Sequence, residues 1–168
     1  GSANVFNWLN AGLSTNAIIE NLSLENGIEY FVSVRATDYA GNTSESISSN
    51  GLIVDLESPQ GVFIYDNSFI EDQDWTNIGN ELSAHWAFED LLSGVASYRY
   101  AIGTSPGSSN FVDWTENGLE TSFELLGISL QTGITYYVSV RATDAIGNES
   151  ESFISDGIAT DFFSPTVG

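Results

Sequence analysis

The sequence TYYVSVRATD, residues 135–144, decides the fold because apolar and polar side chains alternate along it. A period of two is typical of a β-strand with one buried face. We therefore expect Tyr136, Val138, Val140 and Ala142 to face a hydrophobic core, and the residues between them to face outward.

The same phrase occurs earlier in the chain, as EYFVSVRATD at residues 29–38. The two copies lie 106 positions apart, and this offset aligns residues 1–62 with residues 107–168 without a gap, with 29 identities in 62 positions. A repeat this faithful indicates tandem duplication. Because Gly1 aligns with Gly107, in the middle of the repeat unit, we expect the chain to be a window onto a longer repetitive polypeptide.

The phase of the repeat predicts the domain organisation. Residues 1–56 would be the C-terminal half of a module, residues 57–163 a complete module, and residues 164–168 the start of the next linker. A half-module leaves a hydrophobic face and strand edges open. We expect that face to be completed either by upstream sequence or by another chain.

Two further segments alternate in the same way, and no segment shows a helical period. Their inward residues would be Leu82, Ala84, Trp86 and Phe88 in the first, and Ala96, Tyr98, Tyr100 and Ile102 in the second. About seven short strands separated by turn-rich stretches predict an all-β fold, an antiparallel β-sandwich.

The segment LQTGITYYV, residues 130–138, resembles the Leu-x-Pro-Gly-Thr-x-Tyr corner of fibronectin type III domains, with Thr132 in place of the proline. The resemblance implies an immunoglobulin-like sandwich in which Trp86 is the core tryptophan. It also implies that the hydroxyls of Tyr136 and Tyr30 bond back to the preceding loop. The phrase VRATD-x-x-GN is similar to stalk repeats of very large bacterial adhesins.

Composition excludes several classes of function. The 168 residues carry 23 acidic and three basic side chains, for a net charge of −20, and contain no cysteine and one histidine. All three basic residues are arginines. Such a chain would be repelled by nucleic acid and by anionic lipid, and no apolar run is long enough for membrane insertion. Disulfides, cysteine nucleophiles and Schiff-base lysines are impossible, while 42% apolar residues support a packed core rather than disorder.

Catalysis fits the sequence poorly, so we expect no enzymatic activity. His85 is expected on the outward face of a strand. The neighbouring carboxylates Glu71-Asp72 and Glu89-Asp90 would need to face each other across a cleft for acid–base chemistry, and small sandwiches rarely have one.

Calcium is the cofactor that the acidic residues favour. In a fibronectin-like module, the loops after the second and sixth strands lie at the pole where the chain enters. That geometry would gather Asp55, Glu57, Glu89, Asp90 and Asp144 around an interdomain ion. A second acidic loop, residues 66–74, would lie at the far pole. The alternative is that the acids only keep a repetitive β-protein soluble.

These features predict a non-catalytic stalk repeat of a long extracellular adhesin, which spaces a distal binding tip from a bacterial cell surface. Its partners would be neighbouring repeats, together with a surface glycan or another cell-surface protein. The alternative is an accessory spacer or glycan-binding module of a secreted polysaccharide-degrading enzyme. An exposed platform formed by Trp8, Trp75 or Trp114 would favour that alternative, and buried indoles the stalk.

Overall fold

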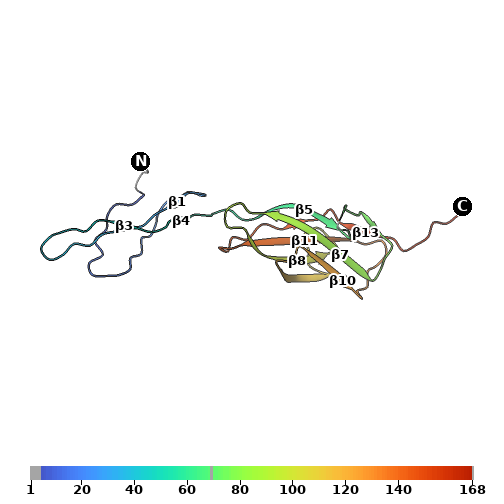
Figure 1. Cartoon of the computed structure of the whole chain (residues 1–168). Helices are drawn as coiled ribbons and strands as arrows, with labels where there is room; N and C mark the ends of the chain where they lie inside the picture. Colours follow the sequence, from blue (N-terminus) through green and yellow to red (C-terminus); the bar gives the residue numbers. More distant parts are fainter. Residues whose placement is uncertain (1–4, 69, 168) are drawn as a thin grey trace. The chain divides into compact units, whose positions relative to one another are not determined.

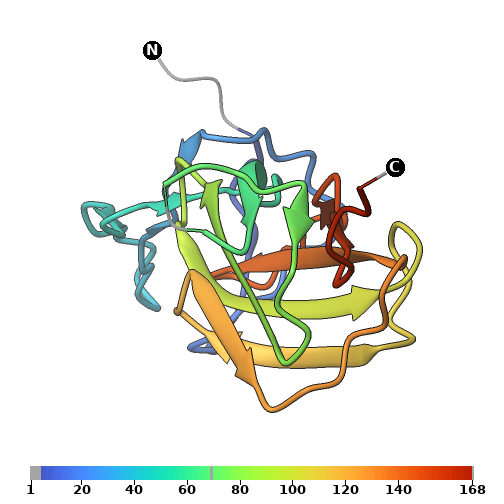
Figure 2. The ribbon, with the colours of Figure 1, turned by 90° about the vertical axis from the view of Figure 1, so that its right-hand side faces the viewer.

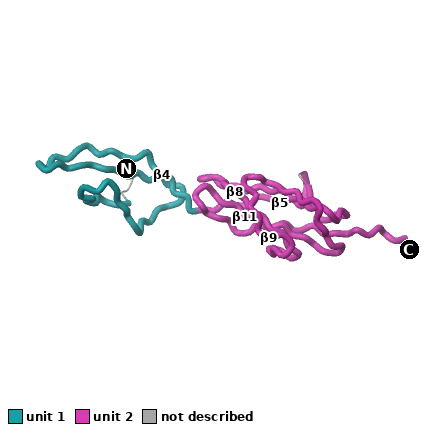
Figure 3. The backbone as a smooth tube through the Cα atoms, turned by 90° about the horizontal axis from the view of Figure 1, so that it is seen from below, with its two compact units in different colours: residues 1–56 teal, residues 57–168 magenta. Residues whose placement is uncertain are grey.

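The computed structural model describes residues 5–68 and 70–167, and every helix or strand among them is a β-strand (Figure 1). The chain divides into two compact units, residues 1–56 (unit 1) and residues 57–168 (unit 2) (Figure 3). The strands of unit 1 are β1 (Glu29–Tyr30), β2 (Ser33–Val34), β3 (Ile47–Ser48) and β4 (Leu52–Ile53). The strands of unit 2 are β5 (Gln60–Asp66), β6 (Trp75–Thr76), β7 (Glu81–Glu89), β8 (Val95–Gly103), β9 (Val112–Gly118), β10 (Ser122–Leu126), β11 (Thr135–Asp144), β12 (Phe153–Ile154) and β13 (Ile158–Thr160).

Unit 2 is a β-sandwich, as the alternation predicts. One sheet has the strand order β10-β7-β5, and the other has the order β6-β13-β11-β8-β9, with β12 also paired to β11. The paired strands β8 and β11 run side by side in Figure 2. The only parallel pairing among the described strands joins β13 to β6, and all others are antiparallel.

The core lies between these sheets and consists largely of the inward residues that the sequence predicts. Trp86 is 2% exposed, and its ring lies 5.9 Å from Tyr98, 6.3 Å from Tyr100 and 6.2 Å from Phe123, measured between centroids. The predicted inward residues of β7 and β11 are all buried: Leu82, Ala84, Trp86, Phe88, Tyr136, Val138, Val140 and Ala142. Aromatic and β-branched side chains thus supply most of the apolar surface that folding removes from water.

Two predictions about individual side chains are wrong. Ala96, expected inside, is exposed, because the register between β8 and β11 shifts at this point and leaves Ala96 as the extra residue of a bulge. Ser139, expected outside, is buried. It lies on β11, which has β8 on one side and β12 and β13 on the other, and at a central position even a small outward side chain is covered.

The tyrosine corner forms in both copies of the repeat, which confirms that prediction. The backbone N–H of Gln131 donates to the Tyr136 hydroxyl at 3.0 Å, and the N–H of Glu25 donates to the Tyr30 hydroxyl at 2.9 Å. Each hydroxyl therefore holds the loop that precedes its strand.

Replacing Tyr136 by Phe should lower the free energy of unfolding of unit 2 by about 1–2 kcal/mol, because the Gln131 N–H loses its acceptor in a partly buried place. Tyr30→Phe is the matched control, since it removes the same hydrogen bond at an exposed place in unit 1 and should change the unfolding of unit 2 by less than about 0.5 kcal/mol. Urea denaturation followed by tryptophan fluorescence measures both. Equal losses in the two variants would contradict this role of the corner.

Unit 1 repeats the backbone hydrogen bonds of the C-terminal half of unit 2. The N–H of Gly27 donates to the Val54 carbonyl at 2.8 Å, and the N–H of Gly133 donates to the Thr160 carbonyl at 2.7 Å. The gapless sequence repeat is therefore also a repeat of backbone conformation.

The burial of equivalent side chains differs sharply between the two units. Three apolar positions that are fully buried in unit 2 are mostly exposed in unit 1: Val32 (68%), Val34 (64%) and Leu52 (68%), against 0% for each of Val138, Val140 and Ile158. In unit 2 the opposite sheet has the order β10-β7-β5, and two of its three strands, β5 and β7, come from residues 57–106. Unit 1 contains no segment equivalent to residues 57–106.

Candidate metal centres

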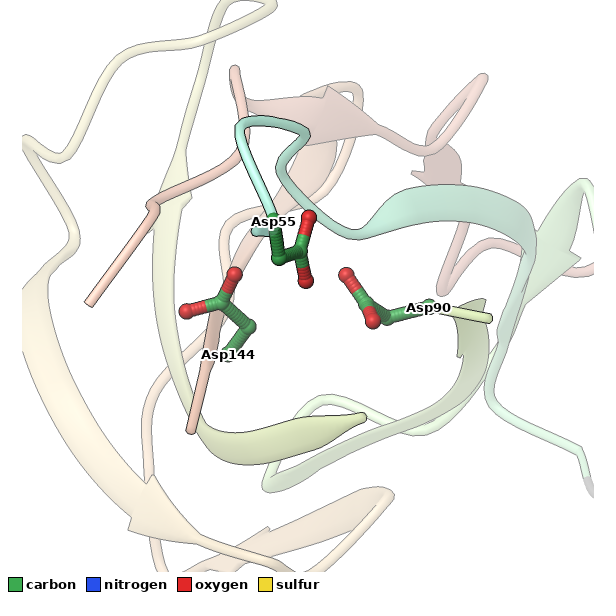
Figure 4. Close-up of side chains that lie close together, drawn as sticks. All are labelled: Asp55, Asp90 and Asp144. Carbon is green, nitrogen blue, oxygen red and sulfur yellow. The ribbon is translucent and has the colours of Figure 1, made fainter. Parts of the chain in front are cut away.

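Three of the predicted ligands lie close together. Asp55, Asp90 and Asp144 each offer one carboxylate oxygen, and these oxygens lie within 4.8 Å of one another (Figure 4). Asp55 is 7% exposed and Asp144 is 3% exposed. We call these three residues the first acidic group.

Asp144 closes its own loop. Its Oδ1 accepts hydrogen bonds from the backbone N–H groups of Ile146, Gly147 and Asn148, and its Oδ2 accepts one from the Asn148 side chain. Burial disfavours the charged form, but these bonds outweigh it and hold the pKa of Asp144 below its ordinary value. The carboxylate is therefore ionised and fixed in place.

Asp90 has a similar role in the loop between β7 and β8. Its Oδ1 accepts the backbone N–H groups of Leu92, Ser93 and Gly94 at 3.1, 2.9 and 2.8 Å. A backbone bond from Ala145 to Gly94 joins this loop to that of Asp144 at 3.1 Å. Two carboxylates of the first acidic group are thus each held by hydrogen bonds within a loop, and a backbone hydrogen bond joins the two loops.

Asp38 shows that closure of the loop is enough to explain the hydrogen bonds around the Asp144 carboxylate. It is the repeat equivalent of Asp144, and it accepts hydrogen bonds from the backbone N–H groups of Ala40 and Asn42 and from the Asn42 side chain. The side-chain bond from Asn42 is the main reason that the pKa of Asp38 is low. The D-x-x-G-N phrase therefore encodes a self-closing loop, a role that the sequence analysis did not identify.

The other two predicted ligands lie outside the first acidic group. Glu57 and Glu89 are both exposed, and neither belongs to the group of carboxylates described above. The alternation of β7 explains the position of Glu89, because the residue that precedes it, Phe88, faces the core. The Glu57 backbone carbonyl, rather than its carboxylate, accepts a hydrogen bond from the Asn148 side chain at 3.0 Å.

A second acidic group consists of Asp66, Asp72 and Asp156, whose carboxylate oxygens also lie within 4.8 Å of one another. The sequence predicts an acidic loop at residues 66–74 but gives no indication that Asp156 joins it. The corresponding position in the first copy is Asn50, so the repeat offers no signal either.

The tryptophans differ in exposure. Trp86 is in the core, whereas the side chains of Trp75 and Trp8 are 67% and 55% exposed. Trp8 and Trp114, at equivalent repeat positions, lie under arginine side chains, with the guanidinium carbon of Arg35 4.2 Å from the Trp8 ring and that of Arg141 4.8 Å from the Trp114 ring. These two indoles are engaged in cation–π contacts within the chain.

His85 lies on the outward face of β7, as predicted, and is half-buried. Its Nδ1 is 2.6 Å from the Ser68 carbonyl oxygen, and its ring meets the rings of Phe63 and Tyr65 edge-on at 5.2 and 5.1 Å. These contacts give His85 a packing role on the outer face of the sheet.

The chain has similarities among solved structures at low identity. The FN1–FN3 domains of chicken CNTN1 are 16% identical over 82% of this chain and 45% of that one, with a TM-score of 0.40. The fn3 domain of human contactin 1 is 16% identical over 67% of this chain and 84% of that one, with a TM-score of 0.38. A β-1,2-glucanase from Parabacteroides distasonis is 14% identical over 75% of this chain and 16% of that one, with a TM-score of 0.35.

Neither a protein-family model nor a curated protein matches the sequence. The chain spans 45% of the chicken CNTN1 fragment. Among residues 5–68 and 70–167, no helix is long and apolar enough to cross a membrane.

Proposed function

We propose that this chain is a non-catalytic spacer repeat of a long extracellular polypeptide, in which consecutive β-sandwich modules carry a binding tip away from a bacterial surface. A spacer of this kind requires only folded modules of one type, joined one after another along the chain. Neighbouring repeats of the same polypeptide are then the principal partners, with a surface glycan or another cell-surface protein bound elsewhere.

The observation that carries this proposal is the repetition of loop closures and backbone bonds at the 106-residue spacing. The Asp38 and Asp144 loops are built alike, and so are the Tyr30 and Tyr136 corners. Selection for a stalk preserves the internal contacts of every module, because each module must fold beside similar neighbours. A catalytic chain would instead need a distinct constellation in one module.

The acidic surface fits the same role. A net charge of −20 with no lysine keeps a repetitive β-protein soluble and discourages edge-to-edge association. The first acidic group would take calcium in this setting, since its donors are all hard carboxylate oxygens. Asp161 stands at the repeat position of Asp55, so a following module could supply the same arrangement again.

The alternative function, glycan binding beside a secreted polysaccharide-degrading enzyme, is favoured by one observation. The Trp75 side chain is 67% exposed at the start of β6, where an indole could stack on a sugar ring. Polysaccharide binding that is lost on Trp75→Ala, with the fold retained, would favour this alternative over the spacer.

Small-angle X-ray scattering tests the spacer directly. Chains extended by one and by two further copies of residues 57–162 should show a maximum dimension that grows in proportion to the number of modules. A compact assembly would instead grow with a power of chain length near 0.4. Linear growth supports a stalk, and compact growth would contradict it.

A further inference from the structure

Asp66, the last residue of β5, is buried with little compensation for its charge. Its side chain is 0% exposed, and neither carboxylate oxygen has a hydrogen-bond partner of good geometry. A buried carboxylate that is neither paired nor hydrogen-bonded is strongly unfavourable. An unpartnered, fully buried acid in an otherwise well-packed sandwich needs either a proton or a cation.

Two other carboxylates lie beside it. Asp72 and Asp156 complete the second acidic group, and one oxygen from each of the three side chains lies within 4.8 Å of the other two. Asp72 and Asp156 are exposed, so the group has one buried and two solvent-facing members. An ion from solution could reach the group from its exposed side and be held by the buried carboxylate.

The backbone fixes all three residues. The Asp66 N–H donates to Asp72 Oδ1 at 2.6 Å, which closes the loop between them. Asp156 follows Ser155, whose N–H donates to the Val138 carbonyl at 2.9 Å and whose hydroxyl accepts the Val138 N–H at 3.0 Å. Hydrogen bonds from the backbone therefore hold Asp72 and the segment of Asp156 in place, as a preorganised site requires.

Among the described residues, the arginines pair with groups other than these carboxylates. The chain has three arginines and no lysine. Arg99 and Arg141 form ion pairs with Glu149, and Arg35 lies over Trp8. Among the described residues, no arginine forms an ion pair with Asp66, Asp72 or Asp156.

Burial, helped by the charges of Asp72 and Asp156, raises the pKa of Asp66 to about 7, although the nearby Ser155 hydroxyl and Gly157 N–H partly offset this. Burial and the neighbouring Asp72 also raise the pKa of Asp156. Both shifts have the direction expected for carboxylates that lack a counter-ion.

We propose that Asp66, Asp72 and Asp156 form a calcium site in unit 2, separate from the first acidic group. An all-carboxylate donor set suits a hard cation, and Zn²⁺, which prefers histidine and thiolate, would find neither. The three oxygens lie within 4.8 Å of one another, close enough for one Ca²⁺ with ligand distances of about 2.4 Å to contact all three.

The full chain, freed of metal by chelation and titrated with calcium chloride, tests the site by isothermal calorimetry and by amide chemical shifts in NMR spectra. Asp55→Asn/Asp90→Asn serves as the background, because it disables the first acidic group. In that background we expect calcium to shift the amides of Asp66, Asp72 and Gly157. Adding Asp66→Asn or Asp156→Asn should weaken the calcium affinity by at least about tenfold.

Glu124→Gln is the matched control, since it removes one exposed charge from β10, on the same unit, and should leave the calcium affinity unchanged. Asp156 is exposed, so its variant tests the site even if Asp66→Asn fails to fold. The proposal is overturned if calcium shifts none of these amides in the background variant, or if it binds equally well without Asp66 and Asp156.

Discussion

A second copy of residues 57–106 placed ahead of residue 1 should turn unit 1 into a complete, cooperatively folded sandwich. In the present chain Val32, Val34 and Leu52 are 68%, 64% and 68% exposed, while their equivalents in unit 2 are fully buried. Fully burying side chains of this size is worth about 1.5–3 kcal/mol each. With the core aromatics of the added copy included, the free energy of unfolding of the new module should reach the usual 5–15 kcal/mol of a small domain.

Hydrogen exchange measures this at single residues. The amides of Val32 and Val34 should gain protection of several orders of magnitude in the extended chain, because exchange from a cooperative module requires its global opening. The matched control carries Ala at the position of the added copy that corresponds to Trp86, which removes the centre of the new core and should cancel most of the gain. Equal protection with and without the added segment would show that residues 57–106 are not the missing half.

That expectation follows from the feature that the sequence predicts best, the alternation along β7 and β11. Successive side chains of a strand point to opposite faces, so the alternation of apolar and polar residues determines which face is buried. Accordingly, Leu82, Trp86, Val138 and Val140 are buried as predicted. The tyrosine corner is equally local, since Tyr136 and its donor, Gln131, are only five residues apart.

Features that depend on long-range pairing could not be predicted. The parallel pairing of β6 with β13 involves two or three residues of each strand, too few to show a period. Asp156 lies close to Asp66 because Ser155 is hydrogen-bonded to β11 and because β13 pairs with β6. No pattern along the sequence predicts either pairing. The first acidic group was partly predictable, because loops at one pole of a sandwich converge. The alternation of β7 alone is enough to exclude Glu89 from this group, because it places Glu89 on the outward face next to the inward-facing Phe88.

The second large effect is on the pH dependence of stability. The metal-free chain should lose stability in unit 2 as the pH rises from about 4 to about 7. Burial, with the charges of Asp72 and Asp156, raises the pKa of Asp66 from 3.8 to about 7. Between these values the folded chain keeps a proton that the unfolded chain has released, so each pH unit lowers the free energy of unfolding by about 1.4 kcal/mol, or about 4 kcal/mol over the window. The raised pKa of Asp156 acts in the same direction.

Below this window the sign reverses. The pKa values of Asp144 and Asp38 are lowered by their loop hydrogen bonds, so the stability that these carboxylates contribute is present above pH 3.8 and is lost as the pH falls through their folded values. Stability of the metal-free chain should therefore be greatest near pH 4, an unusually acidic optimum. Calcium should move the optimum upward, because a bound cation replaces the proton that Asp66 otherwise needs.

Urea denaturation between pH 4 and pH 8, with chelator and with calcium, measures both slopes. Asp66→Asn should flatten the decline between pH 4 and pH 7 and leave the metal-free variant more stable than the parent at pH 8, since the amide carries no charge to bury. The same variant should bind calcium at this group at least about tenfold more weakly. It should therefore be more stable than the parent without the ion and gain less stability when calcium is added. A purely structural carboxylate would behave in the opposite way, because its replacement would cost stability under both conditions. A variant that retains the parent's slope would show that Asp66 is not the titrating group.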